Sequence, residues 1–129
     1  MIPAGLRVFV ALEPIDMRRS IDGLVLAVAE RFQQDARSER ALWVFANLRR
    51  DRLKVLWWDA TGWCVLYKRL EGHRAVLPET PSGAVRATID ARTLAAILDG
   101  VKRSATAKEI VREARERASI IAPSLTPAR

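Results

Sequence analysis

Two neighbouring stretches decide how this chain folds, Leu53-Lys-Val-Leu-Trp-Trp58 and Trp63-Cys-Val-Leu-Tyr-Lys-Arg-Leu70. Both are rich in β-branched and aromatic residues, which is typical of strands. The segment Asp59-Ala-Thr-Gly62 joins them as a tight hairpin, in which we expect Gly62 to supply the positive φ that closure requires. Loops of two, three and four residues all fit this segment, and a three-residue loop places Lys54 opposite Lys68.

Further strands are expected on either side of this hairpin. Residues 7–12 and 42–46 are apolar and β-branched, a short edge strand fits 74–77, and Ile89 closes a last strand. Two helices are also expected. One spans 17–34, with Asp16 as its N-cap. The other spans 90–99, with Asp90 as its cap and Gly100 as its stop. The apolar stripe of the first helix comprises Ile21, Leu24, Val25, Val28, Ala29 and Phe32.

These elements predict an α+β fold, in which a small, mostly antiparallel sheet packs against two helices. From Ser104 the composition changes, and Thr106 and Glu109 fit a capping box. An alanine-rich apolar stripe then follows, flanked by an Arg112–Glu116 pair at i,i+4 spacing. We therefore expect an α+β domain over 1–103 and a basic helical tail over 104–129 whose end is disordered.

The chain is strongly basic. Its 129 residues, enough for one domain, carry 22 Lys and Arg against 15 Asp and Glu, a formal charge of +7. Such an excess favours nucleic acid or acidic surfaces as partners. Cys64 is the sole cysteine, so an intrachain disulfide is excluded. No signal peptide or membrane-spanning run is recognisable, so we expect a cytoplasmic protein without a membrane partner.

The residues that usually carry catalysis are sparse. One histidine, His73, and one cysteine are too few for a structural zinc site, and no glycine-rich phosphate loop is present. A carboxylate nuclease centre is the alternative to test, but capping and turn roles account better for its candidate residues. We therefore expect no cofactor, no metal and no catalytic centre. The candidates are Asp16, Asp22, Asp51, Asp59 and Asp90.

A basic turn followed by two aromatic residues is the strongest sign of a binding function. Arg49, Arg50, Arg52 and Lys54 lie within six residues and precede Trp57-Trp58. Because adjacent strand residues point to opposite sides of a sheet, these two tryptophans cannot share one core. One of them requires a covering helix, a partner chain or a nucleic-acid base, and the sequence leaves these alternatives open.

The order of the segments resembles the TnpB accessory protein of IS-sixty-six-type bacterial insertion sequences, which is distinct from the RNA-guided nuclease of the same name. The resemblance rests on Pro14-Ile-Asp-Met-Arg-Arg-Ser-Ile-Asp-Gly-Leu24, Arg49-Arg-Asp-Arg-Leu-Lys-Val-Leu-Trp-Trp-Asp59 and Tyr67-Lys-Arg-Leu-Glu71. It covers about Arg7 to Gly100. Two departures are Leu48, where the family often has a basic residue, and the tail from Ser104, which extends past the family's usual end.

The resemblance implies a protein that is encoded beside a separate transposase, supports transposition and does not itself transfer strands. We therefore expect a non-catalytic accessory factor that binds the DNA of the element ends, the transposase, or both. Other proteins encoded by the element and a second copy of this chain are further expected partners. The alternative is a protein-interaction or dimerisation module without direct DNA binding. The expected contacts are Arg49, Arg50, Arg52, Lys54, Lys68 and Arg69 for nucleic acid, and Trp57 and Trp58 as aromatic contacts.

Overall fold

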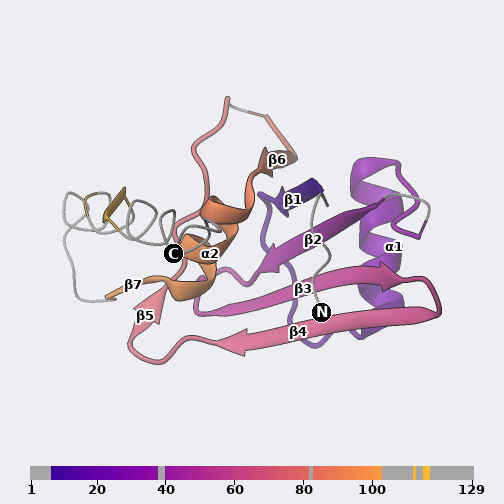
Figure 1. Ribbon diagram of the computed structural model, residues 1–129, viewed down its shortest axis with the longest axis horizontal. Helices are drawn as coiled ribbons and strands as arrows, with labels where there is room; N and C mark the ends of the chain where they lie inside the picture. Colours follow the sequence, from indigo (N-terminus) through magenta and orange to yellow (C-terminus); the bar gives the residue numbers. More distant parts are fainter. Residues whose placement is uncertain (1–6, 38–39, 82, 103–111, 113–114, 117–129) are drawn as a thin grey trace, which may run out of the picture.

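The computed structural model describes residues 7–37, 40–81, 83–102, 112, 115 and 116 of the chain. A five-stranded sheet with the order β4-β3-β2-β1-β6 forms its centre, and a two-stranded sheet pairs β5 with β7 (Figure 1). The strands are β1 (Arg7–Ala11), β2 (Ala41–Ala46), β3 (Arg52–Asp59), β4 (Gly62–Arg69), β5 (His73–Arg74), β6 (Arg86–Ile89) and β7 (Val101–Lys102), and the helices are α1 (Ile21–Phe32) and α2 (Ala91–Asp99).

The sheet is mostly antiparallel, as the sequence predicts. Only the β1–β2 pair within it is parallel, because the chain crosses from β1 to β2 through α1. The expectation of an α+β domain with two helices is thereby confirmed. Of the predicted tail helix, the structure describes three residues, which are helical, and the Arg112–Glu116 ion pair measures 2.8 Å. The remainder of that prediction, with the disorder of its end, lies outside the described residues.

The two helices cover opposite faces of the sheet, and each face has its own core. On the α1 face, Leu24 and Val28 of the helix pack with strand residues such as Trp43 and Phe45. On the α2 face, Leu94 and Ile97 pack with strand residues such as Val44, Val55 and Trp57. In Figure 1, α1 lies behind the strands at the right-hand end of the sheet, whereas α2 lies toward the other end beside β5 and β7. Alternation along β3 therefore decides which side chains face which helix.

The predicted start of the first helix is wrong. The helix begins at Ile21 with Ser20 in the N-cap position, and Asp16 does not cap it. Asp16 instead accepts hydrogen bonds from the backbone N–H and the guanidinium of Arg18, which fixes a local turn ahead of the helix. Within the predicted stripe, Leu24 and Val28 are fully buried, but Ile21 and Ala29 are exposed.

The second helix confirms the predicted cap and stop. The Asp90 carboxylate accepts hydrogen bonds from the backbone N–H and the hydroxyl of Thr93, at 2.9 and 2.7 Å. Gly100 ends the helix with a φ of 72°, and a Cβ at this position would lie 2.9 Å from the carbonyl oxygen of Arg74. Both the left-handed conformation and the close approach require glycine here.

The hairpin closes through a two-residue loop, Ala60 and Thr61, since Asp59 pairs with Gly62. The positive φ lies at Ala60, at 44°, so its expected location at Gly62 is wrong. Lys54 consequently faces Tyr67 rather than Lys68. The short strand predicted over 74–77 is His73–Arg74 and pairs with β7, outside the main sheet. No helix in the described part of the chain is long and apolar enough to cross a membrane.

Candidate nucleic-acid interface

The turn between β2 and β3 is held by backbone hydrogen bonds and by one amide side chain. The Oδ1 atom of Asn47 accepts hydrogen bonds from the backbone N–H groups of Asp51 and Arg52, both at 3.1 Å. Its Nδ2 atom donates to the carboxylate of Asp51 at 2.7 Å. These bonds add to the backbone bonds of the turn, in which the Asn47 N–H donates to the Arg52 carbonyl oxygen and the Arg50 N–H to that of Asn47, both at 3.1 Å. The cations that follow Asn47 are therefore presented from an ordered backbone.

Two of these cations, Arg49 and Arg52, lie on the α1 side of the sheet. Arg49 and Arg52 line a groove of about 520 Å³ together with Tyr67 of β4 and Arg18 of the loop between β1 and α1. Both arginines are exposed, and no carboxylate among the described residues contacts either guanidinium. Tyr67 is 53% exposed beside them. The groove thus combines the two unneutralised guanidinium groups of Arg49 and Arg52 and an accessible aromatic ring with the Asp16–Arg18 ion pair.

The register places Arg52 directly opposite Arg69 on the α1 face. Like charges opposite each other destabilise a strand pair unless a counter-charge lies nearby. Arg69 has such a counter-charge in Glu71, with its Nε atom 2.8 Å from the carboxylate, while Arg52 has none in the described structure. An anion bound at Arg52 would relieve this repulsion.

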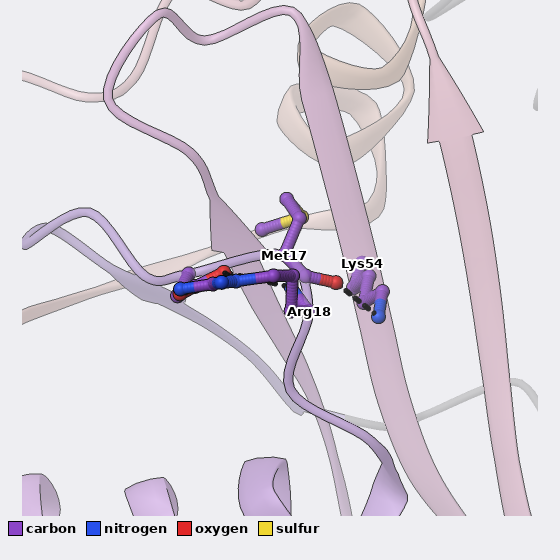
Figure 2. A network of polar contacts seen from close by, with 4 residues as sticks. Met17, Arg18 and Lys54 are labelled. Carbon is purple, nitrogen blue, oxygen red and sulfur yellow. Dashed lines mark hydrogen bonds and ion pairs between the residues drawn. The ribbon is translucent and has the colours of Figure 1, made fainter.

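Lys54 performs a structural task. Its ammonium group donates hydrogen bonds of 2.8 Å to the carbonyl oxygens of Met17 and Arg19, and it lies 5.0 Å from the centroid of the Tyr67 ring. Figure 2 shows the Met17 carbonyl directed at Lys54, while the Arg18 side chain extends away from it. The lysine therefore fastens the loop before α1 onto the sheet, and most of its donor capacity is used there.

Arg50 and Lys68 lie apart from this groove. Arg50 has a left-handed φ of 59°, and its carbonyl oxygen accepts a hydrogen bond of 2.7 Å from the Ala75 N–H. It borders a small cavity with Leu77, whose side chain packs against the α2-face core. Lys68 is exposed opposite Leu53, also on the α2 face. The six basic residues selected from the sequence are therefore divided between two sides of the sheet.

The two tryptophans also separate, as alternation requires. Trp57 is 2% exposed within the α2-face core, so its ring is covered by the protein itself. Trp58 is half-buried on the α1 face near the hairpin tip, where its ring meets that of Trp63 edge to face at 5.0 Å. Of the two proposed aromatic contacts, only Trp58 is accessible in this conformation.

Three of the five carboxylates considered for metal binding have other roles. Asp51 holds Asn47, Asp90 caps α2, and Asp16 pairs with Arg18 at 2.6 Å. Hydrogen bonds from the Arg18 side chain and backbone lower the pKa of Asp16 from 3.8 to about 2, and those from Thr93 lower the pKa of Asp90. Within the described ranges, no three His, Cys, Asp or Glu residues are grouped so that they could hold a metal ion.

Comparison with known proteins supplies the family. The family model described as IS66 Orf2 like protein matches residues 6–108. This chain belongs to that family. As an IS66 Orf2-like protein it is an accessory protein associated with an insertion sequence, as the resemblance in its motifs implies. The proposed division at 103 and 104 falls inside the matched range and stays a prediction.

Two relatives come from Sinorhizobium fredii (strain NBRC 101917 / NGR234). Uncharacterized protein y4jC is 36% identical over 81 residues, which cover 63% of this chain and 68% of the relative. Uncharacterized protein y4hO is 34% identical over 103 residues, which cover 78% of this chain and 87% of the relative. No solved structure matches this IS66 Orf2-like chain.

Reasoning from sequence missed three residues of the groove. Asn47 orders the turn between β2 and β3, and Arg18 and Tyr67 line the groove. An Asn directly before a cluster of charges, with an Asp four residues later, is the signal that could have indicated the turn. Arg18 and Tyr67 lie in the motifs that carry the family resemblance, but their proximity to Arg49 depends on how the loop before α1 lies on the sheet.

Proposed function

We propose that this insertion-sequence protein is a non-catalytic accessory factor for DNA transposition, and that the groove at Arg49 and Arg52 binds phosphates of the element's DNA. The groove residues supply binding and positioning, while the bond breaking belongs to a separately encoded transposase. No cofactor is needed for this role. Lys54 and Asn47 act as positioning residues that hold the two walls of the groove.

One observation carries the proposal: two exposed guanidinium groups without a carboxylate partner in the described structure share a groove with an exposed aromatic ring. Guanidinium groups form forked hydrogen bonds with phosphate oxygens, and the release of condensed counterions from DNA makes such contacts favourable. The excess of seven positive charges over the whole chain acts in the same direction.

The test is the double variant R49A/R52A, titrated against labelled DNA of the element ends by fluorescence anisotropy. We expect roughly 30-fold to 1,000-fold weaker binding at low salt, because each of the two charge-assisted contacts contributes roughly 1–2 kcal/mol and about 1.4 kcal/mol corresponds to a factor of ten. The matched control is R92A/R115A, which removes two exposed charges elsewhere, Arg92 from α2 and Arg115 from beside the cavity that α2 borders. Equal affinity of the double variant and the control would refute the groove as the DNA site.

A protein-interaction module is the second candidate, and one observation favours it. Leu48 is 80% exposed directly before Arg49 of the basic turn and lines the same groove as Tyr67. Exposed apolar side chains next to arginines are typical of anchors in protein interfaces. Pull-down of the transposase with and without DNA, together with light scattering, separates the two functions. Loss of transposase capture in L48S, with DNA affinity unchanged, favours the second.

A further inference from the structure

A second group of aromatic and cationic side chains lies at the tip of the β3–β4 hairpin, away from the basic groove. Trp58 and Trp63 are cross-strand partners on the α1 face, with ring planes at 69°. Trp63 packs against the α1-face core, but Trp58 is not among the residues of that core and is half-buried. The hairpin tip therefore carries a tryptophan, Trp58, that the hydrophobic core covers only in part.

Arg37, from the segment between α1 and β2, lies on this tryptophan. Its Cζ atom is 4.2 Å from the centroid of the Trp58 ring. The Asp35 carboxylate accepts a hydrogen bond of 2.9 Å from the Arg37 backbone N–H, which orders the turn that carries the side chain. Arg37 is exposed, and in the part of the chain that the structure describes no carboxylate contacts its guanidinium. The guanidinium thus lies over the ring on a side chain that is exposed to solvent.

Such an arrangement suits an unpaired nucleotide. Bases that are not stacked in a duplex stack on aromatic rings and on guanidinium planes, and the N–H rim of the same arginine binds phosphate oxygens. Paired bases inside a duplex offer no open plane to such a site. We propose that Arg37, positioned by Trp58, is a contact site for an unpaired nucleotide of single-stranded DNA. The inference rests on the proposed function, because it presupposes that the chain binds DNA.

The position of the site predicts a length requirement. Trp58 and Arg52 share the α1 face of β3 and lie six residues apart, which corresponds to about 20 Å along a strand. A nucleotide strand advances about 3.4 Å per stacked nucleotide, so about six nucleotides separate the hairpin tip from the groove. Only a longer single strand contacts both places at once.

The experiment measures the affinity of the full chain for oligothymidylates of about four and about twelve nucleotides and for a duplex of about twelve base pairs. For R37A we expect about tenfold weaker binding of the longer single strand, a smaller advantage of the longer over the shorter strand, and unchanged duplex binding. W58A behaves like R37A, whereas W58F retains a ring under the guanidinium and binds like the wild type. R92A is the control for the lost charge, and circular dichroism checks that each variant is folded.

Three results would overturn the inference. R37A equal to R92A on the longer strand would remove Arg37 as a contact. W58F as weak as W58A, with both folded, would remove the role of the ring. Equal losses on single strand and duplex would leave only a non-specific charge effect. If R49A/R52A weakens binding while R37A does not, the inference fails and the proposed function stands. If the wild-type chain binds none of these DNAs, the inference fails, and the titration against element-end DNA decides the proposed function separately.

Discussion

Lys54 and Arg52 are two residues apart on the same face of β3, yet the fold uses them differently. The Lys54 ammonium is fixed by two carbonyl oxygens of the loop before α1, whereas the Arg52 guanidinium faces a groove without a carboxylate partner among the described residues. A run of basic residues in a sequence is therefore not one functional unit. Part of it stabilises the fold, and part of it is available to an external anion. We expect mutations to separate the two parts.

The largest effect on stability is expected from Lys54→Met. It removes two charge-assisted hydrogen bonds and leaves the carbonyls of Met17 and Arg19 without this donor, so we expect the free energy of unfolding to fall by about 2–4 kcal/mol. Urea denaturation measures the change. Lys68→Met is the control, since Lys68 is exposed and its loss is expected to change stability by less than about 0.5 kcal/mol. Equal stabilities of the two variants would show that Lys54 does not stabilise the fold and is available to an external anion, as Arg52 is.

Asn47→Ala tests stability and DNA binding together, because this residue stabilises the fold and also positions the cations that are available to an anion. Its loss leaves the N–H groups of Asp51 and Arg52 without their acceptor, and we expect about 1–3 kcal/mol lower stability. DNA affinity is expected to fall as well, since the turn that presents Arg49 loses the side-chain bonds to Asp51 and Arg52 and keeps only its backbone bonds. Leu48→Ala in the same turn is the control for stability. A stable N47A protein with unchanged DNA affinity would show that the turn is ordered by other contacts.

The smallest effect concerns Arg18, whose guanidinium is paired with Asp16 at the edge of the groove. The folded-state pKa of Asp16 is lowered from 3.8 to about 2, so the pair adds stability above about pH 4 and loses it as the pH falls through about 2. Nuclear magnetic resonance titration of the Asp16 carboxyl carbon measures this midpoint. Arg18→Ala should return it toward 3.8, and a midpoint unchanged by that substitution would mean that the pair does not form.

The sequence predicts the elements of this fold because their signals are local. The aromatic and β-branched runs of the hairpin, and the Asp90 and Gly100 signals around α2, each depend on residues close in the chain. The roles of Lys54 and Trp57 depend on distant segments. The carbonyl partners of Lys54 lie 35 and 37 residues away, and Trp57 is buried because its face of the sheet has a core of its own. Alternation predicts that Trp57 and Trp58 diverge, but not which of them the protein covers.

The sequence does not determine the register of the β3–β4 pair. Loops of two, three and four residues are all compatible with the sequence around Gly62, and the observed two-residue loop sets Arg52 opposite Arg69. A four-residue loop over the same segment would keep this pairing, whereas a three-residue loop would shift it by one residue, so the pairing at the groove depends on whether the loop length is even or odd. Arg18, which also lines the groove, becomes recognisable only once the turn and the loop before α1 lie side by side.

The salt dependence of DNA binding tests whether Arg49 and Arg52 contact phosphates. The logarithm of the association constant for element-end DNA is measured against the logarithm of the salt concentration for the wild type, R49A/R52A and R92A/R115A. If Arg49 and Arg52 each neutralise a phosphate, the slope of R49A/R52A is shallower than that of the wild type by about 2, because each contact contributes roughly 0.9. The control keeps the wild-type slope. An R49A/R52A slope equal to that of the wild type would contradict the account.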